Sequence, residues 1–436
     1  MAKLLALIFI SLLANQAIAN DYLYKEEPAF YSYIAGEINR DKILFEQNSE
    51  VYTIPASCIK VVTAMLAYKV LGKDYTYVTK LYEAGDDVII EFGGDVTLTT
   101  EKLIELLSPL KQKQIKGKII LDNSLFIAHH YSSNIIAGDR GKRHSKPISA
   151  LIIDQNEIIL QIVPAKHGEL AKITSNSPHK IDSKIVSSAD PTSISIIWED
   201  NEILAITGNI STEEKVVTKI ISPIKIDNFA IDKIQKITEK LAINAPITIK
   251  NNQSTLPKLK KLINSIKSPP LSQILPPALE ASDNLTFDLL FLSILAQTHD
   301  QKIRDWGEGN NLIKALIKDK LHVDIEKSII ADGSGLSFYN RIKPKFLFEI
   351  LKKNYTDKDF LNAMPTVGYI NAAHDEEILP SYLKAKTGTL LGFRCLCGYD
   401  TRNANPKAFV IMASGFEPLS KKINKVVAKY AASMMQ

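Results

Sequence analysis

The sequence predicts an α/β protein in which a domain of helices and strands is interrupted by an inserted, β-rich region. Three observations support this fold class. The chain has 436 residues, which is enough for two or three compact units. Helical and strand-like patterns occur together near both ends, whereas residues 74–255 carry mostly short β-type runs between turn residues. We therefore expect residues 20–73 and 256–436 to form one domain around the insertion.

The N-terminal segment predicts a hairpin followed by a buried helix. Two β-type runs, 33–38 and 42–45, flank a short polar turn. Pro55 then introduces residues 57–71, which are apolar on nearly every side and stop at Gly72. Such a helix belongs inside a domain rather than on its surface.

The middle of the chain predicts one or two small β-rich modules. Helical spacing of apolar residues is found at 100–110 and 228–241, and we expect these helices to cover the sheets. The β-type runs lie at 87–92, 118–122, 157–163, 193–198, 202–207 and 215–221.

The last third of the chain returns to helices and then to strands. Residues 285–296 form a strongly apolar helical pattern, and strand-like runs follow at 383–390, 392–399 and 408–414. Residues 419–434 predict a closing helix. Its lysine-rich face could touch a lipid surface, but packing on the terminal sheet is favoured.

The composition excludes several classes of protein. Hydrophobic residues make up 45% and charged residues 23%, with only 19 Gly and 19 Pro, so collagen-like, disordered and coiled-coil chains are excluded. The net charge of +5 is scattered rather than gathered in one block. Nucleic acid is therefore disfavoured as a partner.

Residues 1–19 have the features of an export signal. Lys3 supplies the positive charge, residues 4–13 form an apolar run, and small residues precede the cleavage point. The run is too short for a membrane span, which needs about 20 apolar residues. We therefore expect an exported, periplasmic protein whose mature chain begins at Asn20.

The three cysteines, Cys58, Cys395 and Cys397, are too few for a disulfide scaffold. Cys395 and Cys397 are two residues apart on a predicted strand, so both side chains point to one face. Metal binding would need more ligands than are nearby, and buried free thiols are favoured. For Cys58 we expect a packing role, because a helix turns it about 100° away from Ser57.

A serine and a lysine at the start of the first helix are the strongest candidates for catalysis. Positions i and i+3 of a helix lie on one face, which places the Lys60 amine beside the Ser57 hydroxyl. A serine attacks poorly unless a base takes its proton, and a lysine serves if burial and a neighbouring cation lower its pKa. The helix N-terminus would favour negative charge developing near Ser57. An ordinary N-cap is the alternative for Ser57 alone.

A second polar group precedes the apolar helix at 285–296. Ser282 could relay a proton between Lys60 and a leaving amine, and the Asn284 amide could hold Lys60 and bind a substrate carbonyl. Asp283 is expected to point away, into the structure. A helix cap is the alternative for Ser282.

A predicted strand near the C-terminus carries the third polar group. Alternation sends Lys386 and Gly388 to one face, and Gly388 would let a substrate backbone approach this strand closely. Lys386 offers charge, and Thr387 or Thr389 a hydroxyl, to a substrate's terminal carboxylate. The N–H groups of Thr389 and Ser57 would form an oxyanion hole. The alternative is a surface strand with a solvated lysine.

Three short motifs therefore stand in one order along the chain and resemble the set of the penicillin-recognising serine enzymes: Ser57-x-x-Lys60, Ser282-Asp283-Asn284 and Lys386-Thr387-Gly388. Ser57 and Ser282 are 282 − 57 = 225 residues apart, and this gap holds the β-rich insertion. The insertion is similar to that of the D-alanyl-D-alanine carboxypeptidase/endopeptidases of the penicillin-binding protein 4 type (class C penicillin-binding proteins, peptidase family S13). The resemblance runs from about residue 28 to 430 and includes residues 54–57, 92–95 and 332–337.

The resemblance implies an α/β/α domain of the β-lactamase/transpeptidase type, interrupted by two nested small β-rich domains. It also implies that Ser57 attacks the terminal D-Ala–D-Ala bond of peptidoglycan stem peptides, with cleavage of D-amino cross-links as a second activity. β-Lactam antibiotics would then be covalent inhibitors. No cofactor or metal is expected.

Two other functions stay open. A serine β-lactamase would turn benzylpenicillin over instead of trapping it. Class A β-lactamases use an additional Glu to activate water, and no convincing counterpart stands between Ser282 and Lys386. A non-catalytic peptidoglycan-binding protein would lack the nucleophile or the base, yet both are present.

For the substrate side chain, the resemblance aligns Asp139 with an acid that meets the free amine of the diaminopimelic residue. Family members usually carry an Arg for that residue's carboxylate after the loop at 332–337, where this chain has Phe338, which forms no charge-assisted pair. Arg341 is one candidate substitute, and acceptance of amidated or shortened stems is a second explanation. A solvated loop acid is the alternative for Asp139.

Overall fold

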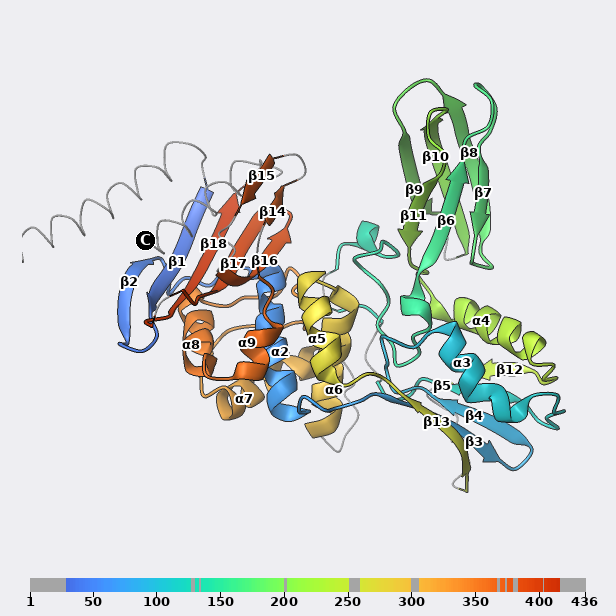
Figure 1. Ribbon diagram of the computed structural model, residues 1–436, viewed down its shortest axis with the longest axis horizontal. Coiled ribbons are helices and arrows are strands. Elements are labelled where there is room, and N and C mark those ends of the chain that lie inside the picture. Colours follow the sequence, from blue (N-terminus) through green and yellow to red (C-terminus); the bar gives the residue numbers. More distant parts are fainter. Residues whose placement is uncertain are drawn as a thin grey trace, which may run out of the picture.

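The computed structural model describes residues 29–126, 130–132, 135–199, 202–250, 259–298, 306–366, 369–372, 375–378, 383–402 and 404–415. The export signal expected at 1–19 and the closing helix expected at 419–434 lie outside these residues. The described chain forms a five-stranded sheet with a layer of helices, and an inserted region with three further sheets (Figure 1).

The five-stranded antiparallel sheet joins both ends of the chain. Its order is β16-β17-β18-β1-β2, and β1 pairs along its whole length with β18. The predicted N-terminal hairpin is present, but its first strand starts earlier than expected because those residues pair with β18. The strands are β1 (Ala29–Glu37), β2 (Lys42–Gln47), β16 (Leu383–Leu390), β17 (Phe393–Asp400) and β18 (Lys407–Gly415), with a separate hairpin of β14 (Tyr369–Ala372) and β15 (Asp375–Ile378).

Helix α2 (Ile59–Val70) is the central helix of this domain. Residues 59–68 are all buried, and α2 contacts every other helix of the layer, as its apolar surface predicted. Helix α8 packs on β1 and β18. The other helices are α5 (Leu271–Glu280), α6 (Asn284–Thr298), α7 (Trp306–Lys320), α8 (Pro344–Asn354) and α9 (Lys358–Ala363). None of the described helices is both long enough and apolar enough to cross a membrane.

The first part of the insertion is a mixed sheet of order β12-β5-β4-β3-β13. Its apolar core includes side chains of α3 and α4, so these helices cover the sheet as expected. Strand β13 lies beyond the boundary predicted at residue 255, yet it pairs with β3. Local patterns do not reveal so distant a partner, and we propose that the insertion extends to residue 267. The elements are β3 (Val78–Ala84), β4 (Asp87–Glu91), α3 (Thr100–Leu107), β5 (Ile119–Asp122), α4 (Ile226–Lys240), β12 (Ile247–Ile249) and β13 (Lys261–Lys267).

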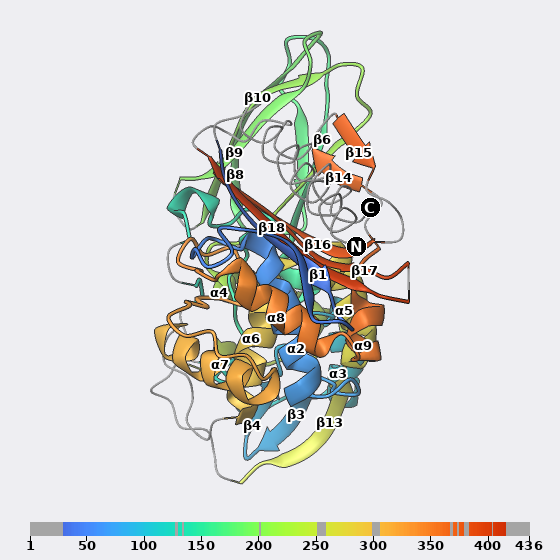
Figure 2. The ribbon, with the colours of Figure 1, turned by 90° about the vertical axis from the view of Figure 1, so that its left-hand side faces the viewer.

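The second part of the insertion is a pair of three-stranded sheets that projects from the rest of the molecule (Figures 1 and 2). The orders are β11-β6-β7 and β8-β10-β9, and the sheets share an apolar core. Strands β7 and β8 were missed from the sequence because they are rich in polar residues. The strands are β6 (Ile158–Val163), β7 (Lys172–Ser175), β8 (Lys180–Ser188), β9 (Ser193–Trp198), β10 (Ile203–Ser211) and β11 (Val217–Ile221).

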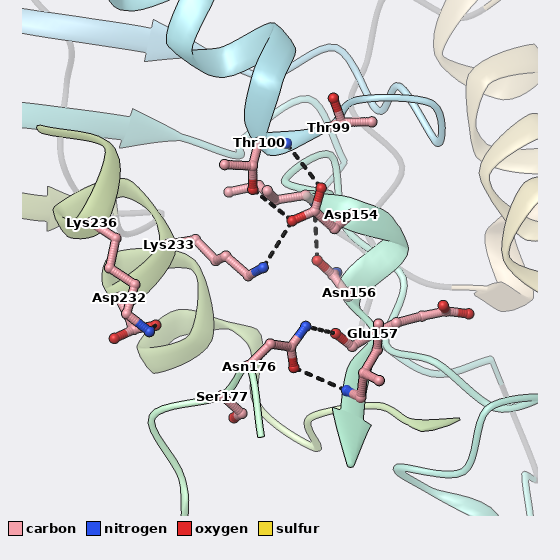
Figure 3. A network of polar contacts seen from close by, with 12 residues as sticks. Thr99, Thr100, Asp154, Asn156, Glu157, Asn176, Ser177, Asp232, Lys233 and Lys236 are labelled. Carbon is pink, nitrogen blue, oxygen red and sulfur yellow. Dashed lines mark hydrogen bonds and ion pairs between the residues drawn. The ribbon is translucent and has the colours of Figure 1, made fainter. Parts of the chain in front are cut away.

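Asp154 ties the two parts of the insertion together (Figure 3). Its carboxylate accepts hydrogen bonds from the N–H and hydroxyl of Thr100, at the start of α3, at 2.9 and 2.6 Å. Lys233 of α4 donates to the same carboxylate at 2.8 Å. Asp154, Gln155 and Asn156 all have positive φ values, of 49°, 54° and 52°, so this network holds a strained turn that leads directly into β6.

Candidate active site

The turn that carries Ser57 is strained and tightly packed. A 3-10 turn, Ala56–Cys58, precedes α2, and Ala56 has a φ of 45°, which costs about 1–2 kcal/mol. A Cβ on Gly335 would lie 1.9 Å from the Ala56 carbonyl oxygen, and a Cβ on Gly388 would lie 3.0 Å from the Ser57 nitrogen. The close approach expected at Gly388 is therefore made, in this structure, to the protein's own nucleophile turn.

Lys60 lies fully buried at the centre of the site. Its Nζ is 2.8 Å from Ser57 Oγ, 2.6 Å from Asn284 Oδ1 and 2.6 Å from the Ser334 carbonyl oxygen. These three partners match the three donors of an ammonium group. The serine and lysine that share a helix face in the sequence are thus in hydrogen-bond contact.

The surroundings lower the pKa of Lys60 to about 7. Burial is the larger cause, and the neighbouring charge of Lys386 is the second, while Asp288 and Asp332 act in the opposite direction. A base with a pKa near neutrality can both accept and return a proton at neutral pH. From the sequence we expected burial and a neighbouring cation to lower the pKa of Lys60, and the structure identifies this cation as Lys386.

Ser282, Asp283 and Asn284, at the connection between α5 and α6, have different structural roles. Ser282 has a φ of 54° and occupies the left-handed position of a helix C-cap, where its N–H donates to Leu279 and that of Asp283 donates to Ala278. Asp283 caps α6, because its carboxylate accepts the N–H of Thr286 at 2.9 Å. The N-cap considered for Ser282 is therefore wrong. Asp283 points into the structure, as expected.

Asn284 connects Lys60 to the insertion. Its Oδ1 accepts from Lys60, and its Nδ2 donates to the carbonyl oxygen of His144 at 2.7 Å. The orientation of the amide is therefore fixed from both ends. Among the described residues, Ser282 makes no hydrogen bond to Lys60 or Ser57, so its relay role stays a prediction.

Strand β16 places Lys386 beneath the site and Thr389 at its opening. Lys386 is only 2% exposed, and its Nζ donates to the Thr387 carbonyl at 2.8 Å. It is thus not the solvated lysine of a surface strand. Thr389 is exposed and lines the cavity in front of Ser57.

This cavity has a volume of about 510 Å³ and is lined by residues of both the sheet domain and the insertion. Asp139 and Phe338, which the sequence singled out, both lie in its wall. Arg341 does not line the cavity, because its Nη1 donates to the carbonyl oxygens of Phe338 and Asn340 at 2.7 and 2.9 Å. The Arg341 guanidinium is thus held by its own loop in this structure, and its role as a substitute for the missing guanidinium stays a prediction. Arg394, which the sequence did not single out, lines the cavity instead.

All three cysteines are buried and free, as predicted. Cys58 Sγ donates to the Lys386 carbonyl at 3.2 Å. Cys395 and Cys397 stand on the neighbouring strand, Cys397 directly opposite Lys386. The thiols therefore pack behind the site. No cluster of metal-ligating side chains occurs in the part of the chain that the structure describes.

Two buried aspartates, Asp288 and Asp332, hold the glycine-rich loop that carries Ser334. Asp288 Oδ1 accepts the N–H groups of Gly333 and Ser334 at 3.0 and 2.9 Å. Asp332 accepts further N–H groups of this loop at 2.7 and 2.6 Å. Because the Ser334 carbonyl binds Lys60, both carboxylates position the base. The sequence signal that could have revealed Asp288 is a single acid within an otherwise apolar helix.

Comparisons with known proteins find relatives along nearly the whole chain. The model of the D-Ala-D-Ala carboxypeptidase 3 (S13) family matches residues 15–434. The D-alanyl-D-alanine carboxypeptidase DacB of Haemophilus influenzae is 27% identical over 413 residues, which cover 88% of this chain and 85% of that protein.

Solved structures share the fold. The crystal structure of penicillin binding protein 4 (dacB) from Haemophilus influenzae matches with a TM-score of 0.83 at 24% identity, covering 96% of this chain and 99% of that chain. The structure of the same protein complexed with a novel β-lactam gives a TM-score of 0.77 at 23% identity, with the same coverage. These similarities confirm the predicted fold class.

Proposed function

Because this chain belongs to the D-Ala-D-Ala carboxypeptidase 3 (S13) family, we propose that it hydrolyses the terminal D-Ala–D-Ala bond of peptidoglycan stem peptides through an acyl-enzyme on Ser57. Its class is that of a serine-type D-alanyl-D-alanine carboxypeptidase. The observation that carries the proposed chemistry is the 2.8 Å contact between Lys60 Nζ and Ser57 Oγ, in a site where the pKa of Lys60 is about 7.

Acylation begins with a proton transfer from Ser57 to Lys60. The neutral Lys60 amine accepts the hydroxyl proton while the serine oxygen attacks the carbonyl carbon of the penultimate D-Ala. The N–H groups of Ser57 and Thr389 stabilise the resulting oxyanion. Asn284 keeps Lys60 aligned and offers its amide to a substrate carbonyl.

Collapse of the tetrahedral intermediate breaks the C–N bond and releases D-Ala. The leaving amine takes the proton held by Lys60, and the Ser282 hydroxyl is the proposed relay. Lys386 supplies positive potential, and the hydroxyls of Thr387 and Thr389 supply hydrogen bonds, for the carboxylate of the leaving D-Ala. Water then attacks the acyl-enzyme and restores Ser57.

The same chemistry extends to two related reactions. Hydrolysis of D-amino cross-links differs only in the leaving amine, so we propose DD-endopeptidase activity as well. The carbonyl of a β-lactam meets the same nucleophile, and these antibiotics should acylate Ser57. Export through the segment at 1–19 would bring the enzyme to its peptidoglycan substrate.

The test uses the mature chain, residues 20–436, with a stem pentapeptide and with benzylpenicillin. Wild type should release D-Ala, and its intact mass should rise by one slowly lost penicillin adduct. Ser57→Ala should abolish both results, whereas Ser108→Ala, at an exposed serine that follows α3, should change neither.

Three outcomes would contradict this function. An adduct on the Ser57→Ala protein would remove Ser57 as the nucleophile. Fast release of opened penicillin would identify a β-lactamase. Peptidoglycan binding without D-Ala release or an adduct would identify a non-catalytic binding protein.

A further inference from the structure

The buried carboxylate of Asp332 accepts four hydrogen bonds from the described residues, and one of them comes from the insertion. Its Oδ1 accepts the N–H of Gly335 at 2.7 Å and the side-chain amide of Asn340 at 2.8 Å. Its Oδ2 accepts the N–H of Ser337 at 2.6 Å and the hydroxyl of Ser132 at 3.2 Å. A carboxylate offers about four lone-pair sites, so these donors fill them. Three donors follow Asp332 in its own loop, whereas Ser132 belongs to the insertion, 200 residues away in the sequence.

The insertion holds Ser132 in place through the two residues that precede it. The carbonyl oxygen of His130 accepts the N–H of Ile148 at 2.6 Å. The hydroxyl of Tyr131 donates to the carbonyl oxygen of Ile224 at 3.4 Å. Ser132 itself is buried, with 4% of its surface exposed. Its hydroxyl therefore reaches the loop from a segment that the insertion anchors.

The loop that receives this bond contacts both the base and the nucleophile turn. The carbonyl oxygen of Ser334 is 2.6 Å from Lys60 Nζ. A Cβ on Gly335 would lie 1.9 Å from the carbonyl oxygen of Ala56, so the loop also packs tightly against the turn that carries Ser57. A buried carboxylate without a full set of donors is costly, so one that loses a donor shifts toward another. Because the carboxylate is part of the loop, such a shift disturbs both contacts.

We propose that Ser132 is a positioning residue: its hydrogen bond to Asp332 lets the insertion fix the loop that holds Lys60 in the reactive arrangement. The proposal rests on the function proposed above and adds to it a residue that acts through Asp332 and not on the substrate. Ser132 does not line the cavity in front of Ser57, so its replacement leaves substrate binding intact. The loss falls on the rate at saturating substrate, because a displaced base affects the transition state and not the bound ground state.

The experiment measures kcat and KM for D-Ala release from a stem pentapeptide by wild type and four variants. Ser132→Ala removes the donor, Ser132→Cys keeps only a weak one, and Ser132→Thr keeps the hydroxyl. Ser222→Ala is the matched control, because Ser222 is also buried in the insertion and its Oγ also donates a hydrogen bond, but to the main-chain oxygen of Asn156 at 3.1 Å. Thermal unfolding shows which proteins are folded at the assay temperature, and benzylpenicillin acylation of wild type tests the proposed function separately.

Ser132→Ala should lower kcat by about 10-fold to 100-fold, the range of a hydrogen bond to a charged group, and leave KM unchanged. Ser132→Cys should change kcat in the same direction. Ser132→Thr should keep most of the wild-type kcat. Ser222→Ala should lower the thermal unfolding midpoint but not kcat, because its hydrogen bond does not reach the loop.

An unchanged kcat in a folded Ser132→Ala or Ser132→Cys protein overturns the proposal. An equal loss of kcat in Ser222→Ala also overturns it, because the loss would then reflect a general loosening of the insertion. A raised KM with an unchanged kcat would place the effect in substrate binding and would overturn it as well. A wild type that releases no D-Ala and that penicillin does not acylate would instead refute the proposed function itself.

Discussion

Replacing Gly335 by alanine should displace the nucleophile. Gly335 has a φ of 83°, and a Cβ there would lie 1.9 Å from the carbonyl oxygen of Ala56. An ordinary contact begins at 3.4 Å, so the two segments would have to separate by 3.4 − 1.9 = 1.5 Å. Both groups belong to the main chain and neither can rotate away, so this shift would reach the adjoining Ser57 or Ser334.

A shift of this size is large compared with the contacts that assemble the site. Lys60 Nζ is 2.8 Å from Ser57 Oγ and 2.6 Å from the Ser334 carbonyl. A misplacement of about 1 Å costs on the order of 100-fold in rate. We therefore expect Gly335→Ala to lower the second-order rate constant of benzylpenicillin acylation by about 100-fold or more.

Gly72→Ala is the matched control. Gly72 has nearly the same φ, 86°, but nothing lies within 4 Å of its hypothetical Cβ. Gly72→Ala should lower the free energy of unfolding by about 1–2 kcal/mol, the conformational cost of alanine at a positive φ, and should leave the acylation rate unchanged. Thermal unfolding measures the stability, and the fraction of protein that carries the penicillin adduct, followed over time by intact mass, measures the acylation rate. Equal acylation rates in the two variants would show that packing at Gly335 does not fix the nucleophile.

Three further outcomes are expected. The rate of acylation should rise with pH through a midpoint of about 7, because Lys60 acts as the neutral amine. Lys386→Met removes the neighbouring cation and should move this midpoint to higher pH. An unmoved midpoint would exclude Lys386 as the charge that lowers the pKa of Lys60. Ser282→Gly should keep or slightly raise the thermal unfolding midpoint, because glycine suits the φ of 54°. The rate of D-Ala release should fall by about 100-fold. An unchanged rate would remove Ser282 from the proton path. Cys58→Ala should cost about 1–3 kcal/mol of stability but keep penicillin acylation, since the thiol packs behind the site; a folded variant without acylation would make the thiol a participant.

The sequence predicted the side chains of the site better than its main-chain groups. Ser57 and Lys60 share a helix face, and their chemistry can be read from residue type alone. The carbonyl oxygens of Ser334 and His144 also hold the site together, yet every residue has a carbonyl, so residue type gives no signal for them. Such acceptors become visible only when the path of the chain is known.

Choices between similar residues were also beyond the sequence. Ser282 and Asp283 are both good helix caps, and only the C-cap geometry of α5 assigns the capping of α6 to Asp283. Arg341 and Arg394 have the same side chain. The strand register places Arg394 opposite Thr389, whereas Arg341 binds its own loop. Long-range pairing decides such cases, as it does for β13, whose pairing with β3 could not be read from the local sequence pattern.

The insertion takes part in the active site because one of its loops contacts Asn284, which binds the base, and also lines the cavity. The amide of Asn284 is held by Lys60 at one end and by the His144 carbonyl at the other. Asp139 and His144, from the same loop, form part of the cavity wall. Movement of this loop would free the amide and leave Lys60 without one of its fixed acceptors. On the proposed function, a substrate side chain bound by this loop would also fix the Asn284 amide beside Lys60, so that binding energy gained away from the scissile bond would help to assemble the catalytic groups.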